Sequence, residues 1–234
     1  MRTLIAILAI VIVLAGCSNP SGSQGGQQVN KTIVCFGDSL TEGYGASKPG
    51  EVDKSKSYPA YLQKKTSRPV VNAGISGDTS SGALARVDKD VLSKKPGMVI
   101  ILLGANDFFH LRPASETKGD LQKILNKLKS ENRKIYLVSF IGDANWEAGI
   151  FGTPFALVSG FSTSSLAALL SDYRKMLAEL TAENRDIGYI PDIWTGVWGI
   201  HMSDPIHPNA EGYEIIADTV FNAIKKNLTT EYAE

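Results

Sequence analysis

The sequence predicts an α/β protein, a three-layer α/β/α sandwich with a central parallel sheet of about five strands. Five short runs of β-branched and other apolar residues alternate along the chain with longer stretches of helical periodicity. Most of the short runs are apolar at nearly every position, as expected for strands that are covered on both faces. The length of 234 residues suits one medium-sized domain.

The candidate strands are residues 32–36, 69–72, 98–103, 134–139 and 187–190. No internal repeat relates them. Each is followed by polar or glycine-containing sequence and then by a helical stretch, which is the order of a βαβ unit.

The helices between the strands show start signals or one apolar face. Ser57 is a candidate N-cap with Pro59 in the first turn, and the helix extends to about Thr66. The last helix begins after Pro208 and ends near the basic pair 225–226, which suits a helix C-terminus. Two further helices each have one apolar stripe, formed by Leu121, Ile124, Leu125 and Leu128 and by Leu166, Leu169, Leu170, Tyr173, Leu177 and Leu180.

The N-terminal segment has the features of a processing signal. Arg2 precedes an apolar run over residues 4–14, and the run ends in Leu14-Ala15-Gly16-Cys17. This pattern resembles the bacterial lipoprotein signal, which implies lipidation of Cys17, an anchor to the membrane and a location in the cell envelope outside the cytoplasm. The alternative is an ordinary secretory signal that happens to contain a cysteine.

These features divide the chain into four parts. We expect a signal peptide at residues 1–16, a lipidated cysteine and flexible tether at 17–30, the folded domain at 31–228 and a C-terminal tail at 229–234. The tether is rich in Gly, Ser and Gln and offers little apolar surface to bury.

The composition excludes several classes of protein. Lys and Arg together number 24 and balance 24 Asp and Glu, so the chain lacks the basic excess of a nucleic-acid binder. Two cysteines are too few for a disulfide scaffold, and three histidines limit any metal site. Cys35 lies inside the first strand, where we expect it to pack as a small apolar residue.

Four polar segments lie where parallel strands present working residues, at the strand ends or just before the last helix. They are residues 37–40, 72–79, 104–107 and 204–208. Each alone has a structural explanation as a turn or helix cap. Together, however, they supply every part of an acyl-transfer site at one edge of the sheet.

At these segments the sequence resembles the SGNH hydrolases, or GDSL esterases, which are named for Ser, Gly, Asn and His in four separate blocks. Ser39, Gly77, Asn106 and His207 match the four blocks in order. The similarity runs from residue 31 to about residue 227, and the second block reads much like that of the thioesterase, lysophospholipase and arylesterase branch. The resemblance implies the flavodoxin-like SGNH hydrolase fold.

Two features depart from that branch. Ala105 stands where the branch commonly has Gly before the Asn. Residues 141–163 do not match the shorter substrate loop expected there, which leaves the choice of substrate open.

The residue chemistry gives each block a role. A serine hydroxyl needs a base within hydrogen-bond reach, and His207 is the candidate base for Ser39. Asp204 can accept the proton of the other ring nitrogen and fix the tautomer. The candidate oxyanion hole comprises the backbone N–H groups of Ser39 and Gly77 and the side-chain amide of Asn106. This mechanism needs no cofactor and no metal.

The substrate pocket is less well defined by the sequence. The candidate pocket residues are Asp38, Phe108, Phe155, Phe161 and Trp194. His110 is a further candidate for the pocket wall. The apolar residues of the 141–163 segment favour acyl or aryl groups, although they would equally pack that segment onto the domain.

We therefore predict a serine esterase, expected to be monomeric, that hydrolyses carboxylic esters through an acyl-enzyme. Its substrates would be small-molecule or lipid esters, with thioesters and lysophospholipids included. Three alternatives remain. One is a carbohydrate O-acetyl esterase with Trp194 and Trp198 as sugar platforms, another is a catalytically silent binding lipoprotein, and the third is a metal site at His201, Asp204 and His207.

Overall fold

The computed structural model describes residues 31–129, 133–152 and 162–229. Its centre is a parallel five-stranded sheet with the strand order β2-β1-β3-β4-β5. The strands are β1 (Ile33–Gly37), β2 (Val70–Gly74), β3 (Met98–Leu102), β4 (Lys134–Val138) and β5 (Gly188–Ile190). The predicted three-layer fold with a parallel sheet is confirmed. The predicted signal, tether and lipidation site at residues 1–30 lie outside the described residues.

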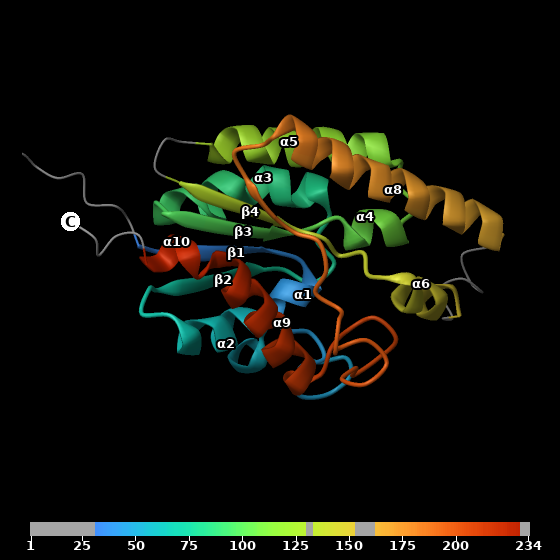
Figure 1. Ribbon diagram of the computed structural model, residues 1–234, viewed down its shortest axis with the longest axis horizontal. Coiled ribbons are helices and arrows are strands. Elements are labelled where there is room, and N and C mark those ends of the chain that lie inside the picture. Colours follow the sequence, from blue (N-terminus) through green and yellow to red (C-terminus); the bar gives the residue numbers. More distant parts are fainter. Residues whose placement is uncertain (1–30, 130–132, 153–161, 230–234) are drawn as a thin grey trace, which may run out of the picture.

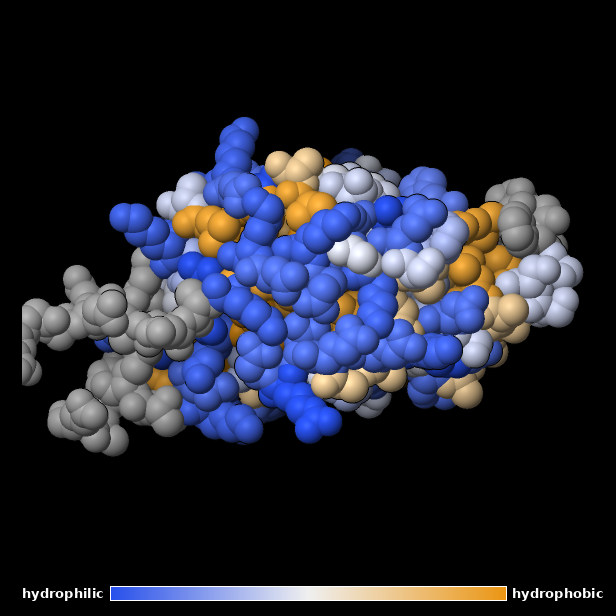
Figure 2. Space-filling view, turned by 90° about the horizontal axis from the view of Figure 1, so that it is seen from above, coloured by the Kyte–Doolittle hydropathy of each residue, from blue (hydrophilic) through white to orange (hydrophobic). Residues whose placement is uncertain are grey.

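Helices cover both faces of the sheet (Figure 1). One layer contains α2 (Tyr58–Lys65) and α9 (Ala210–Ile224), and the other contains α3 (Ser80–Asp90), α5 (Ala114–Leu128) and α8 (Thr163–Glu183). The shorter elements are α1 (Ser39–Glu42), η1 (Lys54–Lys56), η2 (Leu92–Lys94), α4 (Ala105–Phe109), α6 (Ala144–Phe151) and α10 (Lys226–Thr229). The face formed by α5 and α8 is largely hydrophilic, with apolar atoms visible at the end that carries α6 and in a second group toward the opposite end (Figure 2).

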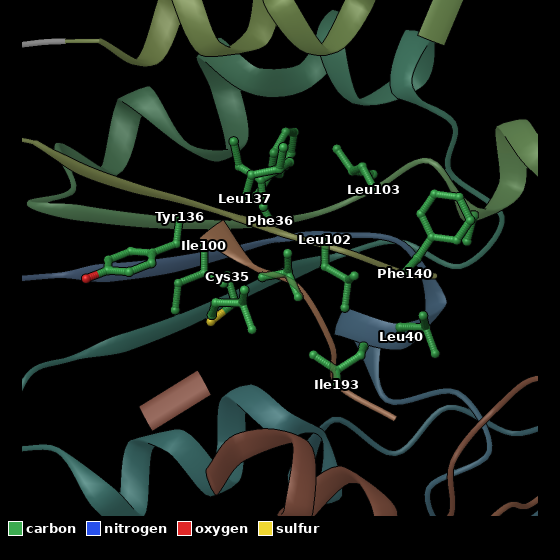
Figure 3. Close-up of a cluster of buried hydrophobic side chains, with 14 of the residues drawn as sticks. Cys35, Phe36, Leu40, Ile100, Leu102, Leu103, Tyr136, Leu137, Phe140 and Ile193 are labelled. Carbon is green, nitrogen blue, oxygen red and sulfur yellow. The ribbon is translucent and has the colours of Figure 1, made fainter. Parts of the chain in front are cut away.

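The core lies on both sides of the sheet because neighbouring strand residues point to opposite faces. Cys35 and Phe36 of β1 are both fully buried and lie on opposite sides, Cys35 together with Ile100 and Phe36 together with Leu137 (Figure 3). Every residue of β1 and β3 is buried. This burial explains the continuously apolar strands in the sequence.

Side-chain caps start the main helices where the sequence indicates. The hydroxyl of Ser57 accepts the N–H of Ala60 at the start of α2, and Asn209 caps α9 in the same way. The apolar stripes of α5 and α8 face the core, except that Leu169 is only partly buried. The last helix ends at Ile224 and is followed by the separate short helix α10.

The second strand lies further along the chain than predicted, at Val70–Gly74 rather than 69–72. Proline at position 69 has no N–H for the ladder, so the strand begins after it. At the other end, Gly74 pairs with Gly37 of β1, and a Cβ at Gly74 would overlap the backbone of Glu42. A strand end without side chains therefore allows α1 to pack directly against β2.

The order of the strands creates a crevice. In the sheet, β2 lies on one side of β1 and β3 lies on the other. The connections that follow β1 and β3 therefore lead in opposite directions from the carboxyl ends of these two strands. Ligands of open parallel sheets bind at such a point. Within the described residues, no helix has the length and apolar character needed to cross a bilayer.

Candidate active site

Ser39 lies at this crevice, at the first position of α1 and directly after β1. The carboxylate of Asp38 accepts the N–H of Leu40 at 3.0 Å and so caps the short helix. Glycine at position 37 permits this tight turn, since a Cβ there would clash with Thr41 and with the carbonyl of Leu102. The serine is 9% exposed, and its side chain faces the cavity described below.

His207 reaches Ser39 from the loop before α9. Its Nε2 lies 3.0 Å from Ser39 Oγ, and its Nδ1 lies 2.8 Å from Oδ2 and 3.0 Å from Oδ1 of Asp204. The same carboxylate accepts the backbone N–H groups of Ile206 and His207, which closes the loop around the acidic residue. The ring of Tyr44 packs against the imidazole with centroids 4.5 Å apart.

These contacts define the direction of the hydrogen bonds. An ionised carboxylate only accepts, so Nδ1 of His207 carries the proton and donates it to Asp204, and Nε2 accepts the hydroxyl proton of Ser39. Partial burial raises the pKa of Asp204, but the bonds from His207 and the N–H of Ile206 outweigh it and hold that pKa below its usual value. The acidic residue is thus ionised at neutral pH.

Three hydrogen-bond donors face the same space. Gly77 has φ +80°, a backbone conformation that favours glycine, and a Cβ there would meet no atom within 4 Å. Asn106, in the first turn of α4, donates one amide hydrogen to the carbonyl of Asp78 at 2.9 Å and keeps a second. In the part of the chain that the structure describes, the backbone N–H groups of Ser39 and Gly77 have no acceptor.

Two carboxylates, the buried Asp107 and the partly buried Glu42, hold the donor segments together. Asp107 is fully buried and accepts the N–H and hydroxyl of Ser80 at 2.8 and 2.7 Å, which joins α4 to the start of α3. Arg112 donates to the same carboxylate at 2.7 Å. On the other side of Gly77, the N–H and hydroxyl of Ser76 both donate to Glu42 at 2.7 Å.

A cavity of about 330 Å³ opens above Ser39. The residues that line it with polar groups, which we name the polar wall, are Ser39, Ser76, Gly77, Asn106 and His207. The larger aromatic and aliphatic lining residues, which we name the apolar wall, are Phe109, Phe140, Trp146, Ile150 and Trp194. The remaining lining residues are Leu40, Tyr44, Ala105 and Ile206. Among the residues that the structure describes, none that lines the cavity is Asp, Glu, Lys or Arg.

The predicted pocket residues fare differently. Trp194 lines the cavity, and its indole N–H donates to the carbonyl of Phe140 at 2.8 Å. The prediction that Phe108 lines the pocket was wrong, because Phe108 is fully buried against Phe140 and Tyr173. Its neighbour Phe109 lines the cavity instead. The two rings diverge because successive helix residues point about 100° apart.

Two further candidates do not line the cavity. Asp38 lies fully buried beneath Ser39, and His110 is exposed outside the lining. Phe155 and Phe161 lie outside the described residues. The described part of the long segment nevertheless reaches the cavity, since Trp146 and Ile150 of α6 belong to the apolar wall.

Sequence reasoning did not assign Tyr44, Ser76, Phe140 or Trp146 to the pocket. Phe140 lies two residues after the end of β4, so a search of every strand end, rather than of polar strand ends only, could have found it. Ser76 lies within the 72–79 segment itself, and Tyr44 lies shortly after the 37–40 segment. Trp146 carries no local signal, because its place depends on packing against Trp194 and Trp198.

Two buried groups near Ser39 have perturbed acidities. Burial raises the pKa of Asp38 to about 7, although the N–H of Leu40 opposes that shift. Its Oδ2 atom has no partner in the described part of the structure. Burial likewise raises the pKa of the Cys35 thiol to about 12, so this cysteine stays protonated and inert. Across the described ranges, no three His, Cys, Asp or Glu side chains form a group suited to a metal ion.

The comparisons with known proteins agree with this geometry. Residues 35–215 match the GDSL-like lipase/acylhydrolase family. Esterase TesA of Pseudomonas aeruginosa is 28% identical over 207 residues, which cover 86% of this chain and 92% of that protein. The thioesterase 1/protease 1/lysophospholipase L1 of Escherichia coli K12 is 30% identical over 194 residues, which cover 80% of each chain.

A comparison with solved structures leads to a protein of the same name. A crystal structure of TesA superposes with a TM-score of 0.65 and 25% identity, covering 83% of this chain and 98% of that one. The family match spans every residue that lines the cavity. This chain is therefore an ester-hydrolysing enzyme that belongs to the GDSL-like lipase/acylhydrolase family.

Proposed function

We propose that this protein is a serine esterase that cleaves carboxylic esters through an acyl-enzyme, with Ser39 as nucleophile, His207 as base and Asp204 as the residue that orients the base. The observation that carries the proposal is the unbroken series of hydrogen bonds from Asp204 through His207 to Ser39 Oγ. This series ends in a cavity where two backbone N–H groups have no acceptor within the described residues.

The geometry supports the following sequence of steps. Nε2 of His207 takes the hydroxyl proton while Ser39 Oγ forms a bond to the ester carbonyl carbon. The carbonyl oxygen becomes negative and is stabilised by the N–H groups of Ser39 and Gly77 and the amide of Asn106, each worth about 10²- to 10³-fold in rate. The imidazolium then protonates the departing alcohol, and the acyl group stays on Ser39.

Deacylation repeats these steps with water. Water enters where the alcohol left, gives its proton to His207 and attacks the acyl carbon. Collapse of the second tetrahedral intermediate returns the proton to Ser39 and releases the acid. Asp204 stays ionised throughout and stabilises the imidazolium.

The apolar wall supports a preference for acyl or aryl groups. Its five side chains present aromatic and aliphatic surface, and none of the described lining residues is Asp, Glu, Lys or Arg. An apolar group on the substrate would lose its contact with water there, whereas a sugar hydroxyl would lose hydrogen bonds. Oxyesters of this kind are the proposed substrates, with thioesters and lysophospholipids as further candidates that the printed names of relatives suggest.

No observation favours a carbohydrate O-acetyl esterase or a catalytically silent binding protein. Trp194 is 4% exposed and Trp198 packs on its edge with centroids 5.4 Å apart, so neither ring offers an open platform for a sugar. A silent binding protein has no need for the Ser39, His207 and Asp204 arrangement. The lipid anchor at Cys17 and a location in the cell envelope stay predictions from the sequence, which fractionation of a Cys17→Ser variant checks.

The proposal is tested by an activity profile with p-nitrophenyl esters of increasing acyl length beside acetylated sugars. We expect turnover of the p-nitrophenyl esters and a loss of about 10⁴- to 10⁶-fold in kcat for Ser39→Ala, because Ser39 carries the hydroxyl that the base His207 contacts. A fluorophosphonate probe should label wild-type protein at Ser39 and leave the variant unlabelled. Retained turnover in a folded Ser39→Ala protein, or labelling at another residue, contradicts the mechanism.

A further inference from the structure

Arg86 has an unusual set of partners beside the cavity. It lies on α3, its side chain is 13% exposed, and it does not line the cavity. Its guanidinium reaches the carboxyl ends of two adjacent strands: Nη2 donates to the carbonyl of Gly37 and Nη1 to that of Ala73, both at 2.9 Å. The arginine therefore joins the end of β1 to the end of β2.

The same guanidinium binds two carboxylates. Nε and Nη2 both lie 2.7 Å from Oδ2 of Asp78, and Nη1 lies 3.2 Å from Asp90. Its plane packs over the ring of Phe36 at 4.5 Å. An arginine side chain has five N–H groups, and five acceptor contacts surround this one. Such a match fixes a planar fork in one orientation, which an ammonium group with three donors cannot reproduce.

These partners belong to the segments that carry the candidate oxyanion donors. Gly37 lies two residues before Ser39, and Asp78 directly follows Gly77. The carbonyl of Asp78 accepts the amide of Asn106 at 2.9 Å, so the third donor is held through the same residue. Arg86 touches two of the three segments and reaches the third through one hydrogen bond.

We propose that Arg86 is a positioning residue of the oxyanion hole, whose guanidinium sets the spacing of the Ser39, Gly77 and Asn106 donors. This inference rests on the proposed function. Donors stabilise a developing charge only when they already lie at its position, and a misplacement of about 1 Å can cost about 100-fold in rate. Loss of the fork should therefore lower the rate of bond making rather than the binding of the ester.

The test is Arg86→Lys, which keeps the charge and most of the length of the side chain but lacks the planar fork. We expect kcat to fall by about 10- to 100-fold with KM changed by less than about threefold, equally for short and long acyl esters. The rate of Ser39 labelling by a fluorophosphonate should fall in parallel, since that reaction also places charge on the oxyanion donors.

Arg68→Lys is the matched control. Arg68 is 6% exposed and donates to the carbonyls of Asn227 and Leu228, on α10. Its replacement should lower thermal stability while leaving kcat unchanged. Equal losses of kcat in both folded variants would show a general structural effect and overturn the positioning role.

Coupling to Asn106 gives a second measurement. If Arg86 acts through the oxyanion hole, Arg86→Lys should cost less in an Asn106→Ala background than in the wild type. Fully additive losses overturn the inference, as does an unchanged kcat in folded Arg86→Lys protein. If Arg86→Lys does not fold, Asp78→Asn replaces it, with the same expected split between kcat and KM. Absence of ester turnover in the wild type would instead overturn the proposed function itself.

Discussion

The polar and apolar walls of the cavity are held in place by different forces. Polar-wall groups are fixed by hydrogen bonds between distant segments, for example His207 to Ser39 and Ser76 to Glu42. In the apolar wall, side chains pack against one another, and the ring centroids of Trp146 and Trp194 lie 6.3 Å apart. Directional bonds tolerate few residue types at each position, whereas packing accepts many shapes of similar volume.

The small residues behind the two walls show the same difference. Gly37 lets α1 turn tightly so that one hydroxyl is presented at one place. Gly142 and Gly149 instead make room for rings, because a Cβ would lie 2.6 Å from Trp146 Cβ or 2.5 Å from Trp198. We therefore expect changes in the polar wall to affect all substrates alike, and changes in the apolar wall to depend on the acyl group.

After loss of the nucleophile itself, the largest effect is expected for Asp204→Asn, behind the polar wall. An Asn amide can donate to Nδ1 of His207 and favour the tautomer with the proton on Nε2, where it cannot accept the serine proton. We expect kcat to fall by about 10⁴-fold for every ester, as for the corresponding change in a serine protease. Steady-state kinetics with acetate and longer esters check this, and a loss that varies with acyl length would contradict it.

The pH profile of the wild type sharpens the same point. Since the pKa of Asp204 is held below its usual value, its carboxylate stays ionised in mildly acidic solution, and the loss of activity on acidification should follow protonation of the general base instead. The rate should therefore rise with pH and then level off. A profile with no acidic limb would count against a general base in the mechanism.

A smaller and selective effect is expected in the apolar wall. Ile150→Ala removes apolar surface that only a larger acyl group can contact, so kcat/KM for longer esters should fall by about 10- to 200-fold. Acetate esters should change by less than about threefold. Leu180→Ala is the control, because Leu180 is fully buried in α8 and does not line the cavity. Equal losses for all acyl lengths would mean that Ile150 supports the fold rather than the substrate.

The smallest effect concerns stability beneath the polar wall. The folded pKa of Asp38, about 7, exceeds the ordinary 3.8 because burial disfavours the charge. Below pH 3.8 the group is protonated in both states, and the stability it contributes is lost as the pH rises through about 7. Asp38→Asn keeps an acceptor for the N–H of Leu40 and cannot ionise. As the pH rises through about 7, its melting temperature should therefore increase relative to that of the wild type.

Thermal melts of both proteins between pH 4 and 8 provide the measurement. Asp186→Asn serves as a control of opposite sign, because the bond from Lys129 lowers the pKa of this exposed residue. If the difference in melting temperature between Asp38→Asn and wild type is the same at every pH, the Asp38 carboxyl does not change its protonation state over this range. That result would contradict the prediction.

The difference between the walls also explains what the sequence could predict. Continuously apolar strands and capped helices predict the layers of the fold, since both signals are local. Ser39, Gly77, Asn106 and His207 are recognisable because each occupies a fixed place in a polar motif, and the structure brings all four to one cavity. Their catalytic roles stay predictions for the experiments above.

The apolar wall was harder to foresee. Exchanging Phe108 for Phe109 is an error of one residue, but helix α4 has five residues, too few for a periodic pattern to show which ring faces the core. Trp146 lies 48 positions from Trp194 in the sequence, and their contact depends on how α6 packs after β4. Such contacts follow from tertiary packing, which local sequence patterns do not encode.

The hydrogen bond between His207 and Ser39 joins residues 168 positions apart. The hydroxyl of Tyr213 in α9 reinforces this junction by donating to the carbonyl of Tyr44 at 2.7 Å. During synthesis the serine leaves the ribosome early, while its base emerges only when the last helix is about to follow. A chain that ends before His207 is left with a serine that lacks its base, so hydrolysis by this protein requires that synthesis has passed that residue.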